Sequence, residues 1–146
     1  MHLVDILLVE DNPDHAILTK KVLEESHVAN RIHLVEDGER ALDFIYHRGK
    51  YSGGDNAPRP GLILLDIRLP KVDGLEVLKQ IKSDPEYRSI PVVILTTSSR
   101  DEEVARAYDD GANSYVTKPI EFAEFASKVR NVGMYWGLIA SLPTFG

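Results

Sequence analysis

The sequence predicts an α/β fold in which a doubly wound, five-stranded parallel sheet is flanked by five helices. Two observations lead to this prediction. Short apolar runs alternate five times, along the 146 residues, with longer segments whose apolar residues recur at helical spacing. The main runs are apolar throughout, which is typical of strands buried on both faces of a parallel sheet. Right-handed crossovers through helices join such strands, and the whole chain fits one domain of ordinary size.

Each expected strand is a short run that ends at polar or charged residues. The five runs are residues 6–9, 31–35, 62–65, 91–95 and 114–117. The third is followed directly by Asp66, and a Leu-Pro pair then breaks the backbone. An Asp in this place is either a helix cap or a working group at the carboxyl edge of the sheet.

The expected helices are marked by caps and turns as well as by their periodicity. They are predicted at about 13–27, 38–46, 74–83, 101–110 and from 121 onward. Asn12 and Pro13 suit the N-cap and the first position of the first helix. We expect Leu18, Val22 and Leu23 of this helix to face the core.

One connection is longer than helix–strand connections usually are. Residues 48–59 are rich in Gly, Ser, Asn and Pro, and they are predicted to form a surface loop rather than a domain linker. The loop is either a tolerated insertion or a segment that is mobile or contacts a partner. General loop behaviour favours the insertion.

Composition excludes several classes of protein. The apolar fraction of 43% and the charged fraction of 27% are those of a soluble globular protein, and a net charge of −6 argues against a nucleic-acid partner. The chain has no cysteine, so it has neither disulfides nor thiolate chemistry. No run approaches the ~20 apolar residues that span a bilayer. No cleavage signal precedes the first strand, so we expect a cytoplasmic protein without a membrane partner.

The residues that end the predicted strands form a chemically complementary set. They are Glu10, Asp11, Asp66, Thr96 and Lys118. The carboxyl ends of parallel strands share one edge, where ligands of open α/β sheets bind. Three acids in one small site repel one another unless a cation joins them, and Mg²⁺ prefers carboxylate oxygens. A lysine and a hydroxyl then suit a phosphoryl group, and Asp is itself a nucleophile that forms acyl phosphates.

Each member of this set also has an ordinary structural explanation. The acids suit helix N-termini, Thr96 suits a cap, and Lys118 suits a solvated surface. These explanations do not account for matching groups at four of the five strand ends, so we expect a phosphoryl site with Mg²⁺. No dinucleotide or P-loop motif competes with it. The histidines form no metal-ligand cluster, and we expect solvated or capping roles for His2, His15, His27, His33 and His47.

Four motifs in order resemble the receiver domain of response regulators, over about residues 5–132. They are Val-Glu-Asp-Asn at 9–12, Leu-Leu-Asp-Ile-Arg-Leu-Pro at 64–70 with Asp-Gly at 73–74, Ile-Leu-Thr-Thr at 94–97, and Gly-Ala-x-x-Tyr-Val-x-Lys-Pro at 111–119. The resemblance implies a flavodoxin-like sheet with strand order 2-1-3-4-5. It also implies a single receiver domain over residues 1–146, with no output domain after it.

The resemblance implies a chemical role for the acids. Asp66 would accept a phosphoryl group from a phosphohistidine on a partner sensor histidine kinase. Glu10, Asp11 and Asp66 would hold Mg²⁺, together with the backbone carbonyl of Arg68. The chain would then be a phosphoacceptor switch that assists its own phosphorylation and dephosphorylation, and not an enzyme acting on other substrates.

A second group of residues is implied to turn phosphorylation into a change of shape. Lys118 would pair with the phosphate, and the Lys118–Pro119 peptide is typically cis in this family. Thr96 would move inward to bond the phosphoryl oxygens, and Tyr115 would fill the space that it leaves. The fourth helix, fifth strand and fifth helix would shift between two packed states whose populations phosphorylation changes.

A narrower resemblance is to stand-alone regulators associated with phytochromes. It rests on the long loop, on Pro-Arg-Pro at 58–60, and on a tail with Trp136 and Ser-Leu-Pro at 141–143. It implies a phytochrome-type, light-sensing kinase as the partner. The tail at 133–143 either extends the last helix over the core or joins the helix 4–strand 5–helix 5 face in a homodimer. We favour the homodimer, because exposed apolar side chains are costly on a monomer.

Two other functions compete with the phosphotransfer switch. An aspartyl phosphatase needs a second acid two residues after its nucleophile, and Arg68 occupies that place. A receiver that serves only as an unphosphorylated docking module needs no intact acid set, and this chain has one. Both observations favour the switch.

Overall fold

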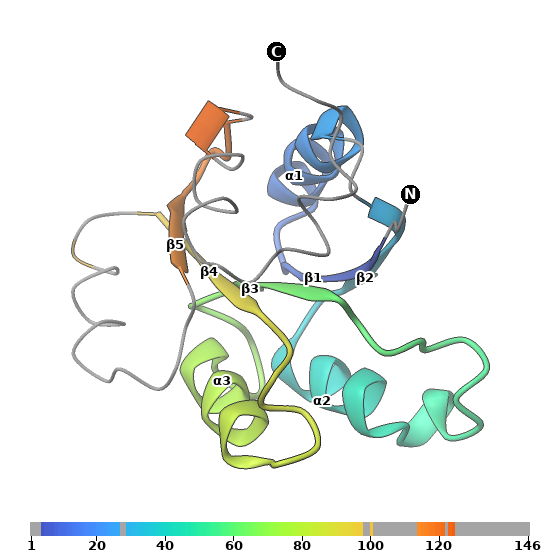
Figure 1. Cartoon of the computed structure of the whole chain (residues 1–146). Helices are drawn as coiled ribbons and strands as arrows, with labels where there is room; N and C mark the ends of the chain where they lie inside the picture. Colours follow the sequence, from blue (N-terminus) through green and yellow to red (C-terminus); the bar gives the residue numbers. More distant parts are fainter. Residues whose placement is uncertain (1–3, 27–28, 98–99, 101–113, 122, 125–146) are drawn as a thin grey trace.

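A five-stranded parallel sheet organises the protein. The computed structural model describes residues 4–26, 29–97, 100, 114–121 and 123–124. The strand order is β2-β1-β3-β4-β5 (Figure 1), and every neighbouring pair is parallel. The strands are β1 (Val4–Val9), β2 (Ala29–Val35), β3 (Leu62–Asp66), β4 (Val92–Thr96) and β5 (Ser114–Thr117). The predicted sheet, its direction and its strand order are confirmed.

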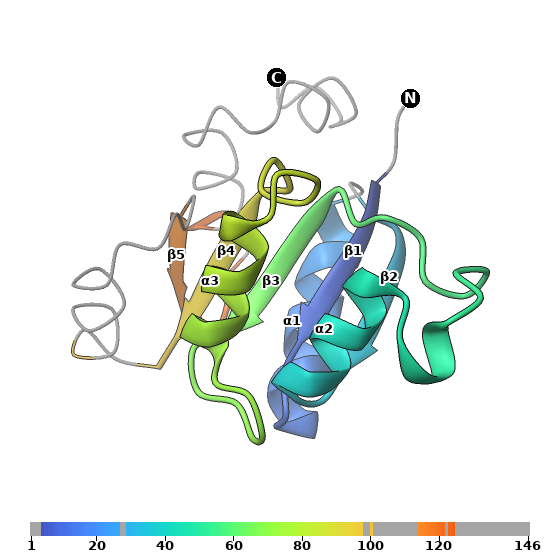
Figure 2. The same ribbon diagram turned by 90° about the horizontal axis from the view of Figure 1, so that it is seen from below.

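Helices cover both faces of this sheet. Helix α1 (Pro13–Ser26) lies on one face, while α2 (Gly38–Tyr46) and α3 (Gly74–Ser83) lie together on the other (Figures 1 and 2). The expected fourth helix and the tail at 133–143 lie outside the described residues, as does the expected fifth helix apart from residues 121, 123 and 124 at its start. Among the helices that are described, none combines the length and the apolarity that crossing a lipid bilayer requires.

The strands are buried on both sides because their residues alternate between two hydrophobic clusters. Ile6 of β1 is in register with Leu62 of β3, and both belong to the cluster that includes Leu23 of α1. The next pair, Leu7 and Ile63, belongs to the cluster beneath α2 and α3. Sequence positions that face either side must therefore be apolar, which explains the continuous apolar runs.

The buried stripe of α1 differs from the predicted one. Leu18 was expected to face the core, but 48% of its surface is exposed. The buried positions are Ala16, Thr19 and Leu23, which follow a helical spacing of three and four residues. The prediction for Leu18 was wrong because one small and one polar residue line this stripe, and an apolar pattern does not reveal them.

The long connection between α2 and β3 packs back against α2. It contains a 3-10 turn at Gly49–Tyr51, and the buried Tyr51 ring lies 5.1 Å from the ring of Phe44, edge to face. Ala57 is also buried, and its carbonyl oxygen lies 2.8 Å from Nε2 of His47. Tyr51 and Ala57 belong to the same hydrophobic cluster as Phe44, so the contacts favour an insertion that packs onto the main core over a loosely attached segment.

Candidate functional site

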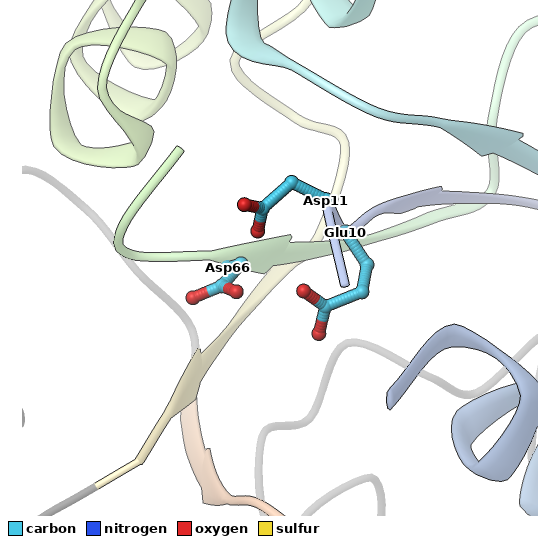
Figure 3. A group of neighbouring side chains, drawn as sticks. All are labelled: Glu10, Asp11 and Asp66. Atoms are coloured by element: carbon cyan, nitrogen blue, oxygen red, sulfur yellow. The ribbon is translucent and has the colours of Figure 1, made fainter. Parts of the chain in front are cut away.

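The carboxyl edge of the sheet brings the predicted acids and the lysine together. Asp66 ends β3, Glu10 and Asp11 follow β1, and Lys118 follows β5. One carboxylate oxygen from each of the three acids lies within 4.8 Å of the others, and Figure 3 shows these groups gathered beside the end of β3. With Arg68 and neighbouring residues, they line a cavity of about 230 Å³.

The ammonium group of Lys118 lies between two of the acids. Its Nζ donates to Oε1 of Glu10 at 2.7 Å and to Oδ2 of Asp66 at 2.8 Å, and it lies 3.0 Å from Nδ1 of His15. Burial lowers the pKa of Lys118, but the hydrogen bonds to Asp66 and Glu10 outweigh burial and raise that pKa above its usual value. The lysine is therefore a buried ammonium, and each of its three N–H groups faces an acceptor.

Glu10 is held differently from the other acids because its side chain is fully buried. Burial raises the pKa of Glu10 from 4.5 to about 7, although the hydrogen bond from Lys118 acts in the opposite direction. The nearby carboxylate of Asp66 raises this pKa further. Oε2 of Glu10 accepts the backbone N–H of Asn12 at 3.2 Å. Glu10 is thus a carboxyl group that a neighbouring cation would help to ionise.

Thr96 brings a buried hydroxyl to the same edge. Asp66 is in register with Leu95, so Thr96 is the next residue along β4. The hydroxyl oxygen of Thr96 is the single buried side-chain nitrogen or oxygen atom, among the described residues, that has no hydrogen-bond partner. Leaving a buried polar group unpaired costs ~1–3 kcal/mol. The end of β4, beside the end of β3, therefore has a buried donor whose hydrogen bond is not used.

The turn after β3 fits closely around Asp66. Oδ1 of Asp66 accepts the backbone N–H of Arg68 at 3.2 Å, and Oδ2 accepts from Lys118, so both carboxylate oxygens have donors. A Cβ atom at Gly74 would lie only 2.1 Å from the carbonyl oxygen of Asp66. Glycine is required there because α3 begins against the backbone of the site, which gives the Asp-Gly motif a physical reason.

The remaining predicted residues lie along β4 and β5. The backbone N–H of Lys118 donates to the carbonyl of Thr96 at 2.7 Å, which ties the ends of the two strands together. Tyr115 is buried, and its backbone is in register with Ile94. The Lys118–Pro119 peptide bond is cis. Lys118 thus lines the site cavity, and Tyr115 belongs to the hydrophobic cluster beneath α2 and α3. The roles of these residues as a switch stay predictions.

His15 is a site residue that the sequence reasoning missed. A solvated or capping role was expected, but its Nδ1 lies 3.0 Å from Nζ of Lys118 and 3.8 Å from Oε1 of Glu10. Asn12 caps the first turn of α1 by accepting the backbone N–H groups of Asp14 and His15. Helical side chains lean toward the N-terminus, so a histidine in this turn points back to the strand end. The place of His15 in the first turn of the helix that follows Glu10 and Asp11 was therefore the signal by which the sequence could have identified it.

A larger cavity of about 550 Å³ lies away from these acids, beside α2 and α3. Two acids, Glu76 and Asp84, are offset there by two cations, Arg48 and Lys79. Volume alone would therefore point to the wrong place, because the group of three acids that can hold a metal ion lies at the carboxyl edge of the sheet.

Comparison with known sequences gives a consistent result. Residues 6–130 match the family described as the response regulator receiver domain. The chain is 47% identical over 132 residues to the "Probable methanogenesis regulatory protein FilR2" of Methanothrix harundinacea, covering 90% of this chain and 82% of that protein.

Solved structures of similar regulators superpose on the chain along most of its length. The bacteriophytochrome response regulator AtBRR is 43% identical, with a TM-score of 0.84, over 93% of this chain and 96% of that one. The Mn²⁺-bound response regulator Rcp1 is 38% identical, with a TM-score of 0.73, over 97% and 99% of the two chains. The phosphorylated cyanobacterial phytochrome response regulator RcpA is 39% identical, with a TM-score of 0.75, over 98% and 100%. Since the family match spans most of its length, this chain belongs to the response-regulator receiver domain family.

Proposed function

We propose that this chain is a stand-alone response regulator of a two-component phosphorelay, in which Asp66 accepts a phosphoryl group from a sensor histidine kinase. The carrying observation is that the carboxylate of Asp66 lies 2.8 Å from the ammonium of Lys118, while Thr96, at the end of the neighbouring strand β4, has a buried hydroxyl without a hydrogen-bond partner. This arrangement offers a nucleophile, a cation and a hydrogen-bond donor to one phosphoryl group. The phosphorylated relative RcpA supports the proposal.

The transfer is a displacement at phosphorus. A carboxylate oxygen of Asp66 forms the new bond to phosphorus while the bond from phosphorus to the imidazole nitrogen of the kinase breaks. The imidazole leaves with that electron pair, so the aspartate becomes an acyl phosphate. The chain's own contribution is to hold the carboxylate in place, through Arg68 and Lys118, and to keep an ammonium beside the new negative charge.

The acids of the site suit Mg²⁺ as donors. Glu10, Asp11 and Asp66 offer carboxylate oxygens only, within a span that one cation can bridge. The backbone carbonyl of Arg68 is the proposed further ligand. When bound, the cation offsets the charge that the carboxylates and phosphoryl oxygens share. The Mn²⁺-bound structure of Rcp1 supports this assignment.

The proposed switch follows from the hydroxyl of Thr96. A phosphoryl oxygen beside β4 accepts this hydroxyl's hydrogen bond, which removes the cost of leaving it unpaired. Tyr115 then takes the place that Thr96 vacates. Phosphorylation shifts the balance between two packed states of the helix 4–strand 5–helix 5 face.

Acetyl phosphate provides the direct test of the phosphoacceptor. Wild-type protein incubated with acetyl phosphate and Mg²⁺ gains the mass of one phosphoryl group, measured on the intact chain. Asp66→Asn gains none, because its amide is not a nucleophile. Asp55→Asn, which changes an exposed acid in the 48–59 insertion, behaves as wild type. A wild-type protein without added mass would instead support the docking module.

The kinase partner is proposed to be of the phytochrome type. AtBRR and RcpA are described as phytochrome response regulators, which supports this choice, whereas FilR2 is described as a methanogenesis regulator. The test compares the rate of phosphotransfer from a purified phytochrome-type kinase with that from an unrelated histidine kinase. A faster transfer from the unrelated kinase would contradict the assignment.

The chain is further proposed to act as a single receiver domain that forms a homodimer through the helix 4–strand 5–helix 5 face and the tail at 133–143. Light scattering of the full chain and of a chain truncated after Gly133 provides the test. We expect the dimer mass for the first and the monomer mass for the second. A monomer mass for both chains would rule the dimer out.

A further inference from the structure

The hydrogen-bond donors of Lys118 are fully used before any phosphate arrives. An ammonium has three N–H groups and accepts no hydrogen bond. The three acceptors within reach are Oε1 of Glu10 at 2.7 Å, Oδ2 of Asp66 at 2.8 Å and Nδ1 of His15 at 3.0 Å. An ammonium only donates, so this contact is a hydrogen bond in the tautomer of His15 that accepts at Nδ1 and carries its proton on Nε2.

This arrangement creates a competition at the moment of phosphorylation. In the proposed function, Lys118 donates to an oxygen of the incoming phosphoryl group. None of its N–H groups is free for that purpose, so one of its three present partners has to be released.

The three partners differ in what their release costs. The bonds to Glu10 and Asp66 are charge-assisted and short, and these side chains are only 0% and 6% exposed. Releasing Glu10 leaves a buried carboxyl group without its cation, and Asp66 stays beside Lys118 because it carries the phosphoryl group itself. The contact with His15 is the longest of the three and involves no carboxylate, and 38% of the His15 side chain is exposed, so water can replace Lys118 as its partner.

The surroundings of the His15 ring also permit it to move. The ring borders the site cavity on one side. It also borders a small second cavity of about 10 Å³, with Thr19 and Ile120 in its wall. Since 38% of the side chain is also exposed, the ring is not enclosed by packed atoms on every side.

We propose that His15 is a positioning residue that holds the third N–H group of Lys118 in the unphosphorylated protein and yields it to a phosphoryl oxygen. This inference rests on the proposed function. It adds a residue that affects the equilibrium between the empty and the phosphoryl-occupied site. The bond from Lys118 to His15 exists only in the unphosphorylated state, so it opposes occupation of the site. Removing the imidazole acceptor favours the occupied state.

Beryllofluoride, a stable analogue of the phosphoryl group, measures this equilibrium without turnover. Its affinity in excess Mg²⁺ is determined by calorimetry for the wild type, His15→Ala and His15→Gln. We expect His15→Ala to bind about 2- to 12-fold more tightly, which is the equivalent of one ordinary net hydrogen bond. His15→Gln keeps an acceptor oxygen and returns toward the wild-type value. The control Ile17→Ala, on an exposed position of the same helix, leaves the affinity unchanged.

A spectroscopic readout on the wild type separates this role from a merely structural one. The ¹⁵N signal of Nδ1 of His15 reports whether Lys118 donates to it. We expect this signal to shift on addition of beryllofluoride, while Nε2 keeps its proton. An unmoved Nδ1 signal, or an unchanged or weaker affinity in His15→Ala, would overturn the inference.

Failure of the inference is distinguishable from failure of the proposed function. If the wild type binds beryllofluoride and gains mass from acetyl phosphate while His15→Ala binds equally well, only the role of His15 falls. If the wild type neither binds the analogue nor gains mass, the phosphoacceptor assignment falls and the role of His15 falls with it.

Discussion

The buried carboxyl group of Glu10 makes the stability of the metal-free protein depend on pH. Burial raises its pKa from 4.5 to about 7. Between these two values the folded protein keeps a proton that the unfolded chain loses. The resulting stability is fully present below the unfolded pKa, and it is lost as the pH rises through the folded pKa. Lys118 has a raised pKa and stays protonated in both states over this range, so it does not offset the effect.

The size of this effect follows from the two pKa values. The whole titration corresponds to about 3 kcal/mol, at ~1.4 kcal/mol for each pH unit between the two pKa values. Between about pH 5.5 and about pH 8, the free energy of unfolding falls by ~2 kcal/mol on account of this group. Mg²⁺ acts in the opposite direction, because it requires the ionised carboxylate and its stabilising effect grows with pH.

Urea unfolding of the metal-free protein across this pH range provides the assay. Glu10→Gln keeps the shape of the side chain but has no proton to lose, so its unfolding free energy loses ~2 kcal/mol less than that of the wild type. Glu24→Gln, at an exposed position of α1, follows the wild type and serves as the control. If the wild type and Glu10→Gln show the same dependence on pH, the reasoning about Glu10 is refuted.

Three further substitutions test other parts of the structure. Thr96→Val removes the unpartnered buried hydroxyl and should stabilise the unphosphorylated protein by about 1 kcal/mol in urea unfolding, whereas a loss of stability would reveal a hidden partner. Gly74→Ala places a Cβ 2.1 Å from the carbonyl oxygen of Asp66 and should cost ~1–3 kcal/mol or more, so an unchanged melting temperature would contradict the close fit. Tyr51→Ala removes a buried ring from beside Phe44 and should cost ~3 kcal/mol and speed proteolysis within the 48–59 insertion; equal cleavage rates would show that the insertion is not docked.

Most of the fold could be predicted because buried parallel strands leave a plain pattern. The run at 62–65 has to satisfy one cluster with its even residues and another with its odd ones, so every position is apolar. The acids could be predicted for a related reason. Each follows a strand, and parallel strands bring their carboxyl ends to one edge, so Glu10 and Asp66 meet although the sequence separates them widely.

The features that were missed depend on how helices are rotated and on which distant segments meet. The order of apolar and polar residues along the chain does not contain this information. The outward position of Leu18 depends on the rotation of α1 about its axis. That rotation buries Thr19, a polar residue that the apolar pattern does not mark as a core position. The contact between His15 and Lys118 joins the first turn of a helix to the end of a distant strand. Tyr51 anchors an insertion whose composition has no periodicity, so its burial depends on Phe44 across the turn.

The 48–59 insertion joins α2 to β3, and it therefore lies toward the amino edge of the sheet, away from the acids. Tyr51 fixes its base, while Asp55 and Asn56 near its tip are exposed. The chain contains no native cysteine, so Asn56→Cys would introduce a unique thiol for a fluorophore. A dye attached there would leave the acidic cluster untouched, which makes this receiver a convenient scaffold for an optical reporter of its encounters with a kinase.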